Sequence, residues 1–186
     1  QLRVGVGDVR HAGAGALVGG LIGNDIDHRR CELAKLAAQY QMDLQVQEVQ
    51  LAQGEQGAAT QGLSVSVRES TVQFAVGQAK PTEAGAEAFG AIAHTYRQAN
   101  PQEKPQDAAA RMGKMRILLV GHTDDTGSSA GNAQLSEARA RAVAEIFAAK
   151  GFDRGQIFYQ GAGETLPVAS NAQEEGRARN RRVEIL

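Results

Sequence analysis

The chain has 186 residues, which is the length of one ordinary domain with an appendage or of two small domains. A hydrophobic fraction of 42% is enough for a core, and an aromatic fraction of 4% without tryptophan indicates aliphatic packing. The net charge of −1 argues against nucleic-acid binding, which requires a concentrated basic surface.

Residues 12–23, AGAGALVGGLIG, form an apolar block in which glycine occupies every fourth position, at Gly15, Gly19 and Gly23. This spacing gives a flat helix face of the kind that lets two membrane helices approach closely. The block is shorter than the roughly 20 residues of a membrane-spanning helix. Two interpretations stay open: a flexible linker, or an element that associates with a membrane or with a second copy. Residues 1–10 do not resemble a signal peptide, which leaves a removed export signal open.

The next segment, residues 31–53, is rich in strong helix formers and predicts an amphipathic helix that acts as a spacer. Its apolar residues recur at steps of three and four: Leu33, Leu36, Ala37, Tyr40 and Leu44. It begins at Cys31, the single cysteine, which cannot form an internal disulfide. The Gly/Gln-rich stretch 54–62 breaks the pattern. We therefore predict three regions: a Gly-rich segment (1–30), a helical spacer with a linker (31–61) and a folded domain (62–186).

Strands and helices alternate in the predicted domain. Residues 63–76 predict a strand, or a hairpin with its turn at residues 68–70. A helix is predicted at 81–99 with Pro81 near its start, and a second helix carries Leu135 to Phe147 and ends at Gly151. The remaining predicted elements are a polar connection (100–115), three strands (116–122, 156–163, 181–186) and a helix capped by Asn171 (171–180). The order β-α-β-α-β-α-β indicates an α/β (α+β) fold, a mixed sheet with helices packed on it.

The loop after the strand at 116–122 carries His122, Asp124 and Asp125, which could ligate a metal ion. A hydrolytic zinc site needs about three protein ligands. The other histidines lie in the appendage or in a predicted helix, so nothing in the sequence completes such a site. Ser128 and Ser129 lack the Gly-x-Ser-x-Gly turn of a nucleophilic serine.

Arg139 lies four residues after Leu135 and four before Val143, on the face that its helix must bury. A buried guanidinium is costly unless it is paired, so Arg139 needs an acidic partner or a bound anion. Asp124, at the end of the preceding strand, is the predicted candidate. Either the two charges form a plain salt bridge, or they stand apart and bind the two ends of a zwitterion, Asp124 the ammonium and Arg139 the carboxylate.

Three ordered blocks carry a family resemblance: GHTDDTGSSAGNAQLSEARARAV (121–143), GAGETLPVASN (161–171) and GRARNRRVEI (176–185). Together they resemble the C-terminal peptidoglycan-binding domain of the OmpA family, over about residues 62–186. That family includes the peptidoglycan-associated lipoproteins and the stator protein MotB. The resemblance implies that Asp124 and Arg139 hold the diaminopimelate side chain of uncrosslinked peptidoglycan stems.

The resemblance also implies which residues surround these two charges. It points to Thr123, Asn132 and Leu135 as lining of the pocket, and to Arg182 as a residue on the ligand side. Backbone N–H groups near Gly127 could add donors for the ligand carboxylate. Phe74, in the first strand of the domain, completes the predicted set.

The chain departs from the family pattern at three places. Phe74 is followed by Ala75, where family members usually have an aspartate. Pro81 and Glu83 stand where a leucine and a proline usually lead the first helix. The connection at 100–115 is longer than is usual in the family.

These observations predict a non-catalytic domain, without metal or cofactor, that binds the peptidoglycan stem peptide and tethers the outer membrane to the cell wall. We expect a periplasmic, outer-membrane-associated protein with no nucleic-acid partner. Similar lipoproteins carry a glycine zipper ahead of the domain and an acylated cysteine upstream; Cys31 lacks the apolar lead of such a site, so the anchor is expected outside this chain. The alternatives are a metal-dependent hydrolase using His122, Asp124 and Asp125, and a membrane-associated structural protein that oligomerises through Gly15, Gly19 and Gly23.

Overall fold

The computed structural model describes residues 23–51, 60–70 and 73–186, and the strands within these ranges form one five-stranded sheet. The strands are β1 (Leu44–Leu51), β2 (Thr60–Arg68), β3 (Ile117–His122), β4 (Ile157–Gly163) and β5 (Arg182–Ile185). The helices are α2 (Gly23–Gln39), α3 (Glu83–Arg97), α4 (Pro105–Lys114), α5 (Ser129–Ala149) and α6 (Glu174–Asn180), with a 3-10 turn η2 (Arg154–Gln156).

The sheet is mixed and has the strand order β1-β2-β5-β3-β4. Its neighbours are antiparallel except for β3 and β4, which run parallel and are connected by α5. A parallel pair needs such a crossover because the chain must return to the end of the sheet where the first strand began. The predicted mixed sheet with helices packed on it is therefore confirmed.

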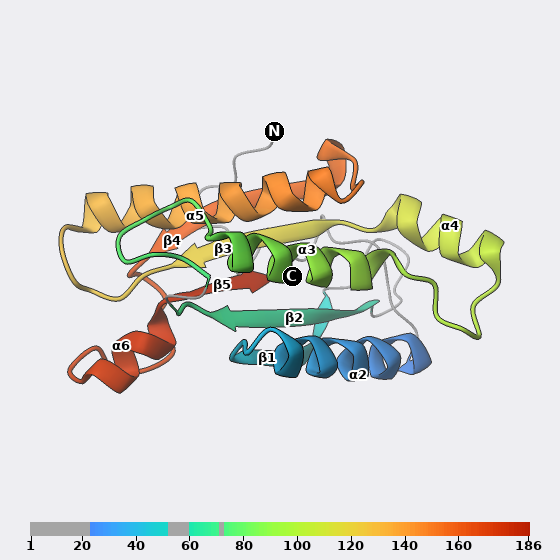
Figure 1. Ribbon diagram of the computed structural model, residues 1–186, viewed down its shortest axis with the longest axis horizontal. Coiled ribbons are helices and arrows are strands. Elements are labelled where there is room, and N and C mark those ends of the chain that lie inside the picture. Colours follow the sequence, from blue (N-terminus) through green and yellow to red (C-terminus); the bar gives the residue numbers. More distant parts are fainter. Residues whose placement is uncertain (1–22, 52–59, 71–72) are drawn as a thin grey trace.

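The main core lies on one face of this sheet. In β2, Val65 is buried in that core, whereas Ser66 points to the opposite face because successive side chains of a strand alternate. Helices α2, α3 and α5 lie side by side over the core face (Figure 1). Large core side chains from these helices include Leu33, Phe89 and Phe147.

Helix α5 lies unusually close to β3 and β4 because glycine faces it in both strands. A Cβ built on Gly121 would lie 2.1 Å from the carbonyl oxygen of Ser136, and one built on Gly161 would lie 2.4 Å from the backbone nitrogen of Glu137. The close contact fixes the position of the first turns of α5 relative to the loop that follows β3.

Most of the predicted elements are confirmed. The helix at 81–99 and the strands at 116–122, 156–163 and 181–186 correspond to α3, β3, β4 and β5, each within two residues at either end. Helix α5 ends as predicted, with Gly151 at a φ of 95° just beyond it.

The predicted helix at 31–53 is wrong in its second half. Helix α2 begins earlier, at Gly23, and ends at Gln39; Leu44–Leu51 is strand β1, which pairs antiparallel with β2 along its whole length. The sequence LQVQEVQL alternates with period two, and that pattern outweighs the helix propensity of glutamine, because every second residue can face the core. The segment predicted as a spacer thus supplies an edge strand of the sheet, while the division of the chain at residue 61 stays a prediction.

Three smaller expectations also need correction. The polar connection at 100–115 contains α4, which starts at Pro105. Residues 63–76 do not form a hairpin: β2 ends at Arg68, and Phe74 forms an isolated bridge with Pro81. Asn171 does not cap the last helix, whose N-cap is Gln173; the Asn171 side chain instead accepts a hydrogen bond from Asn180.

The glycine block mostly falls outside the described residues, which begin within it at Gly23, the first residue of α2. Cys31 is exposed and has a free thiol. Among the helices of the described ranges, none combines the length and the apolar character that crossing a membrane requires.

Candidate functional site

A cavity of about 600 Å³ lies at the end of the sheet where β2 and β3 finish. Figure 1 shows these two strand ends on the left. Six charged residues line the cavity, and four of these come from four different segments. Glu69 follows β2, Asp124 follows β3, Arg139 lies on α5, and Arg181 precedes β5. The fold therefore collects at one end of the sheet charges that are far apart in the sequence.

Asp124 is held in place by the loop that carries it. Its Oδ1 accepts a hydrogen bond of 2.9 Å from the backbone N–H of Thr126, and its Oδ2 accepts one of 2.6 Å from Nη1 of Arg181. The amide of Asn132, in the first turn of α5, donates to the backbone oxygen of Asp124 at 3.2 Å. Burial alone would raise the pKa of Asp124, but the hydrogen bonds from Arg181 and Thr126 hold that pKa below its ordinary value. Asp124 is therefore a fixed anion at neutral pH.

Arg139 is buried and oriented by three contacts. Its Nη1 lies 2.6 Å from Oε2 of Glu69, and its Nε donates to the backbone oxygen of Gln78 at 2.9 Å. Its guanidinium carbon lies 5.2 Å from the ring centroid of Phe74, a cation–π distance. These contacts hold the planar group at the cavity wall.

Asp124 and Arg139 do not bond to each other. Each has its own partner, Arg181 for Asp124 and Glu69 for Arg139, and all four side chains line the same cavity. Of the two interpretations left open for this pair, the plain Asp124–Arg139 salt bridge is therefore wrong. The two charges stand apart on the walls of one cavity, the arrangement that a zwitterion receptor requires.

Of the other predicted site residues, four line the cavity and two do not. Phe74, Thr123, Asn132 and Leu135 are on its wall. The hydroxyl of Thr123 is buried and has no hydrogen-bond partner among the described residues. Gly127, at a φ of 97°, is not on the wall; the backbone donor that the loop supplies is Thr126 N–H, and Asp124 already uses it.

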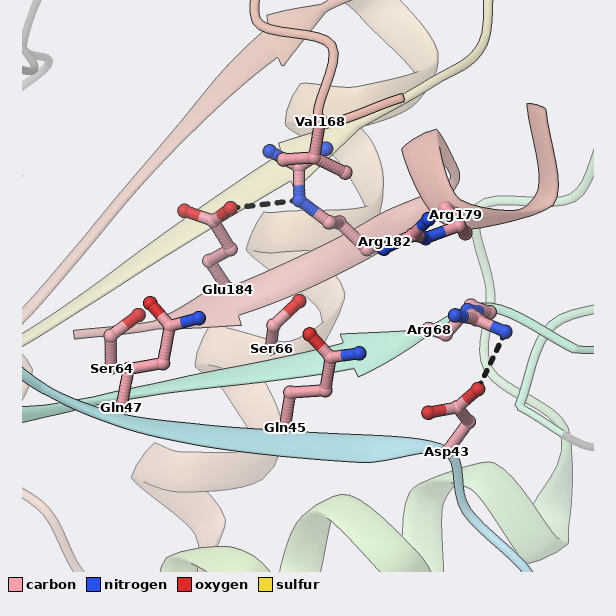
Figure 2. A pocket seen from close by; sticks show the side chains of 10 residues that line it. All are labelled: Asp43, Gln45, Gln47, Ser64, Ser66, Arg68, Val168, Arg179, Arg182 and Glu184. Atoms are coloured by element: carbon pink, nitrogen blue, oxygen red, sulfur yellow. Dashed lines mark hydrogen bonds and ion pairs between the residues drawn. The ribbon is translucent and has the colours of Figure 1, made fainter. Parts of the chain in front are cut away.

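Arg182 is the second residue that the structure places elsewhere. It lies on the face of the sheet opposite the helices, where Nε donates to Glu184 at 2.7 Å and Nη2 donates to the backbone oxygen of Leu166 at 3.2 Å. Figure 2 shows it in a separate, smaller cavity of about 240 Å³, beside polar side chains of β1 and β2. Adjacent residues at the start of a strand point to opposite faces, so Arg181 takes the position that was predicted for Arg182.

The metal-ligand interpretation is not supported by the geometry. His122 lies beside Glu184, with 3.6 Å between Nε2 and Oε2, whereas Asp124 turns to Arg181 and Asp125 is exposed. In the described ranges no three His, Cys, Asp or Glu side chains gather at metal-ligand distance. Burial lowers the pKa of His122, so this ring is neutral at pH 7.

Two of the four charged residues described above, Glu69 and Arg181, were not predicted from the sequence. Glu69 lay in the predicted turn at residues 68–70. The alternating pattern of β2 ends at Arg68, and this was the only signal that could have placed Glu69 at this end of the sheet. The strict alternation of residues 181–186 predicts that Arg181 and Arg182 point to opposite faces of the sheet. It does not predict which of the two faces the loop after β3. The other unpredicted wall residues are Ser70, Val76, Gly77, Thr126, Glu174 and Arg177.

The sequence model of the OmpA family matches residues 73–181, more than half of the chain. The chain belongs to the OmpA family. The matched range contains Asp124, Arg139 and Arg181, and it ends just before β5.

Curated relatives in the OmpA family match the chain over shorter stretches. Outer membrane protein A of Bordetella avium is 51% identical over 69 residues, which are 37% of this chain and 36% of that protein. The peptidoglycan-binding protein ArfA of Mycobacterium tuberculosis (strain CDC 1551 / Oshkosh) is 48% identical over 71 residues, 38% of this chain and 22% of that protein. The chain thus spans well under half of the length of these relatives.

Solved structures resemble this OmpA-family chain over most of its length. The cell wall anchor of the T6SS from Pseudomonas aeruginosa superposes with a TM-score of 0.58 and 28% identity, covering 82% of this chain and 94% of that one. A putative MotB-like protein from Desulfovibrio vulgaris has a TM-score of 0.56 and 21% identity, covering 87% and 91%. The second likeness, at this identity, concerns the fold alone.

Proposed function

We propose that this chain binds peptidoglycan non-covalently, through the diaminopimelate of uncrosslinked stem peptides, and so tethers a part of the cell envelope to the wall. The observation that carries the proposal is the pair Asp124 and Arg139, which line one open cavity without bonding to each other. A receptor for an amino-acid headgroup needs one anion and one fork-shaped cation in the same cavity.

The chemistry of the ligand fits this wall. The side chain of diaminopimelate ends in an ammonium and a carboxylate on one carbon. Asp124 is ionised and can accept the ammonium, and the guanidinium of Arg139 can donate two hydrogen bonds to the carboxylate. The unpartnered hydroxyl of Thr123 is a further hydrogen-bonding group on the same wall.

The relatives lend support. One protein with 48% identity over the matched stretch is named for peptidoglycan binding, and the structure with 28% identity is described as a cell wall anchor. The range matched by the OmpA family model, residues 73–181, contains the loop and helix start that build the cavity, and this supports transfer of the ligand class to this chain.

The test is a calorimetric titration of the purified chain with the stem tripeptide that ends in meso-diaminopimelate. Asp124→Asn and Arg139→Gln should each weaken binding by at least about 30-fold. The first variant leaves the ligand ammonium without its anion, and the second leaves the ligand carboxylate without its cation. Asp125→Asn and Arg141→Gln are the matched controls, because both side chains are exposed close by in the sequence. A tripeptide with lysine in place of diaminopimelate lacks the terminal carboxylate and should bind weakly. Wild-type affinity in both site variants, or equal affinity for the lysine peptide, would refute the proposal.

The cellular setting is inferred from the same relatives, which include outer membrane proteins and a probable lipoprotein. We place the chain in the cell envelope and, more specifically, in the periplasm at the outer membrane, with an anchor that precedes the domain. Association between copies through Gly15, Gly19 and Gly23 stays a prediction, and light scattering of residues 1–186 against 23–186, which lacks the first two glycines, tests it. Equal monomeric masses would remove it.

A further inference from the structure

Glu69 occupies the position at Arg139 that the ligand carboxylate needs under the proposed function, and the present inference rests on that function. Oε2 of Glu69 lies 2.6 Å from Nη1 of Arg139, and the two side chains are only 7% and 5% exposed. The backbone N–H of Glu69 donates to the backbone oxygen of Arg181 at 2.9 Å, which fixes Glu69 to the cavity wall. The carboxylate of Glu69 is therefore a built-in competitor for Arg139.

The other oxygen of Glu69 has no partner in the part of the chain that the structure describes. Oε1 is buried and has no hydrogen bond among the described residues. An ionised carboxylate with a buried, unbonded oxygen is poorly solvated, whereas a neutral acid could use that oxygen as a hydroxyl donor. The geometry thus suits the protonated form of Glu69 once an acceptor reaches the cavity.

The charges around Glu69 come from every neighbouring segment. Arg139 faces it from α5, Arg181 from the start of β5 and Asp124 from the loop after β3, and α6 contributes Glu174 and Arg177 to the same cavity. A ligand carboxylate at Arg139 would add a negative charge next to Glu69 and Asp124. Arg139 would then face two carboxylates, that of the ligand and that of Glu69, and this favours protonation of the buried Glu69.

We propose that Glu69 is a further ligand-binding residue of this site, which binds as a neutral acid and donates its O–H to the ligand carboxylate beside Arg139. The proton comes from the solvent, so one proton is taken up for each ligand bound. Asp124 remains ionised and keeps the ammonium. Carboxylate ligands are then recognised by two groups, a guanidinium and a carboxylic acid.

The titration behaviour of Glu69 supports this role. Burial raises the pKa of Glu69 to about 7; Arg139 and Arg181 lower it in part, and Asp124 raises it further. Neutral pH is thus where the proton can be gained at little cost. Because the complex binds one more proton than the free protein, affinity rises as the pH falls through this pKa.

The experiment is calorimetric titration of the full chain with the meso-diaminopimelate tripeptide at pH 6 and pH 8, each in two buffers of different ionisation enthalpy. The wild type should bind about tenfold more tightly at pH 6 than at pH 8, as one-proton linkage to a pKa of about 7 requires. It should also take up close to one proton at pH 8. Glu69→Gln, which keeps a hydrogen-bond donor but has no charge, should bind at pH 8 about as tightly as the wild type does at pH 6, without proton uptake.

Glu174→Gln is the matched control, because it removes the same charge from the same cavity without touching Arg139. It should retain the pH dependence of the wild type. Wild-type binding with no proton uptake would overturn the inference and leave the proposed function intact, and this arm needs no variant to fold. Loss of binding in Glu69→Gln, or an unchanged pH dependence in it, would also overturn it. Absence of wild-type binding at both pH values would instead refute the proposed function and the inference together.

Discussion

Arg181 and Arg182 are neighbours in the chain, yet they belong to different sites. Arg181 contacts Asp124 and Glu174 at the cavity, while Arg182 is buried on the other face of the sheet against Glu184. Burial by itself would raise the pKa of Glu184, but His122 and Arg182 lower it to about 2. Two neighbouring residues thus pair with different acids, Arg181 with Asp124 at the cavity and Arg182 with Glu184 on the other face of the sheet.

Because the pKa of Glu184 is lowered in the folded state, its contribution to the free energy of unfolding depends on pH. The folded-state pKa of about 2 lies below the ordinary value of 4.5, so between these values the unfolded chain binds more protons and stability falls as the pH falls. At pH 7, Glu184→Gln should be less stable than the wild type by on the order of 2 kcal/mol, and this difference should vanish as the pH approaches 2. Urea unfolding at a series of pH values measures it. Glu175→Gln, on an exposed position of α6, is the control, and a difference for Glu184→Gln that does not change with pH would contradict the assignment.

The sequence was sufficient to predict that Asp124 and Arg139 lie at the same end of the sheet, because a local rule applies to each. An acidic residue directly after a buried strand and an arginine on the apolar stripe of the next helix are visible within one strand–helix unit. Glu69 was not predictable, because it is separated from Arg139 by 70 residues (139 − 69) and its role depends on β2 and β3 ending at the same edge of the sheet. Strand order is a property of long-range pairing, which no short window contains.

At the scale of elements, the contact of α5 with β3 and β4 decides where the cavity forms. The helix carries Arg139 and Asn132, so its height above the sheet sets how far both side chains stand from the loop at Asp124. Gly121 sets this height, because any side chain there would meet the backbone of Ser136.

Gly121→Ala should therefore destabilise the fold and weaken ligand binding. The added methyl would lie 2.1 Å from the Ser136 carbonyl oxygen, and a forced backbone shift of this kind costs about 1–3 kcal/mol or more. Gly113→Ala is the control: nothing lies within 4 Å of the added atom, and alanine in the helix α4 should stabilise by up to about 1 kcal/mol. Chemical unfolding compares the two variants. Equal stabilities would show that α5 can move away from the sheet freely.

The element that sequence reasoning got wrong has an instructive cause. Residues 31–53 contain helix formers throughout, and Leu44 continues the three- and four-residue spacing of α2 by coincidence. The residue that ends this continuity is Gln41, whose φ of 50° turns the chain back toward the sheet. A left-handed residue without glycine leaves no clear mark in a sequence. The strand β1 is then selected by its pairing with β2, and not by local propensity.

At the scale of the molecule, α2 and β1 form one body with the rest of the sheet. Ile26, Leu33 and Met42 are buried, and Arg29, 1% exposed, bonds Asp25 and the backbone oxygen of Thr95 on α3. The core of the described part of the chain therefore includes these residues. A cut at the predicted boundary near residue 61 would expose that surface.

A fragment comparison tests this. Residues 23–186 should unfold at nearly the same temperature as the full chain, because every element described above is present. Residues 60–186 should be less stable by roughly 5 kcal/mol or more, since each lost core side chain contributes about 1.5–3 kcal/mol. Differential scanning calorimetry of the three proteins measures the difference. An equal melting temperature for 60–186 would show that α2 and β1 are dispensable.

Figure 1 shows the start of helix α2 on the right and the ends of β2 and β3 on the left, and the cavity that Asp124 and Arg139 line lies at those strand ends. If the cavity is attached to a fixed mesh and the other end is pulled, the load runs lengthwise through α2 into β1 and from there sideways into β2. The bonds between antiparallel strands lie perpendicular to that direction, so the eight residue pairs from Leu44↔Val67 to Leu51↔Thr60 would resist in shear, all at once and not one after another. The pairing of the edge strand β1 with β2 would then determine how much force the molecule resists before it unfolds.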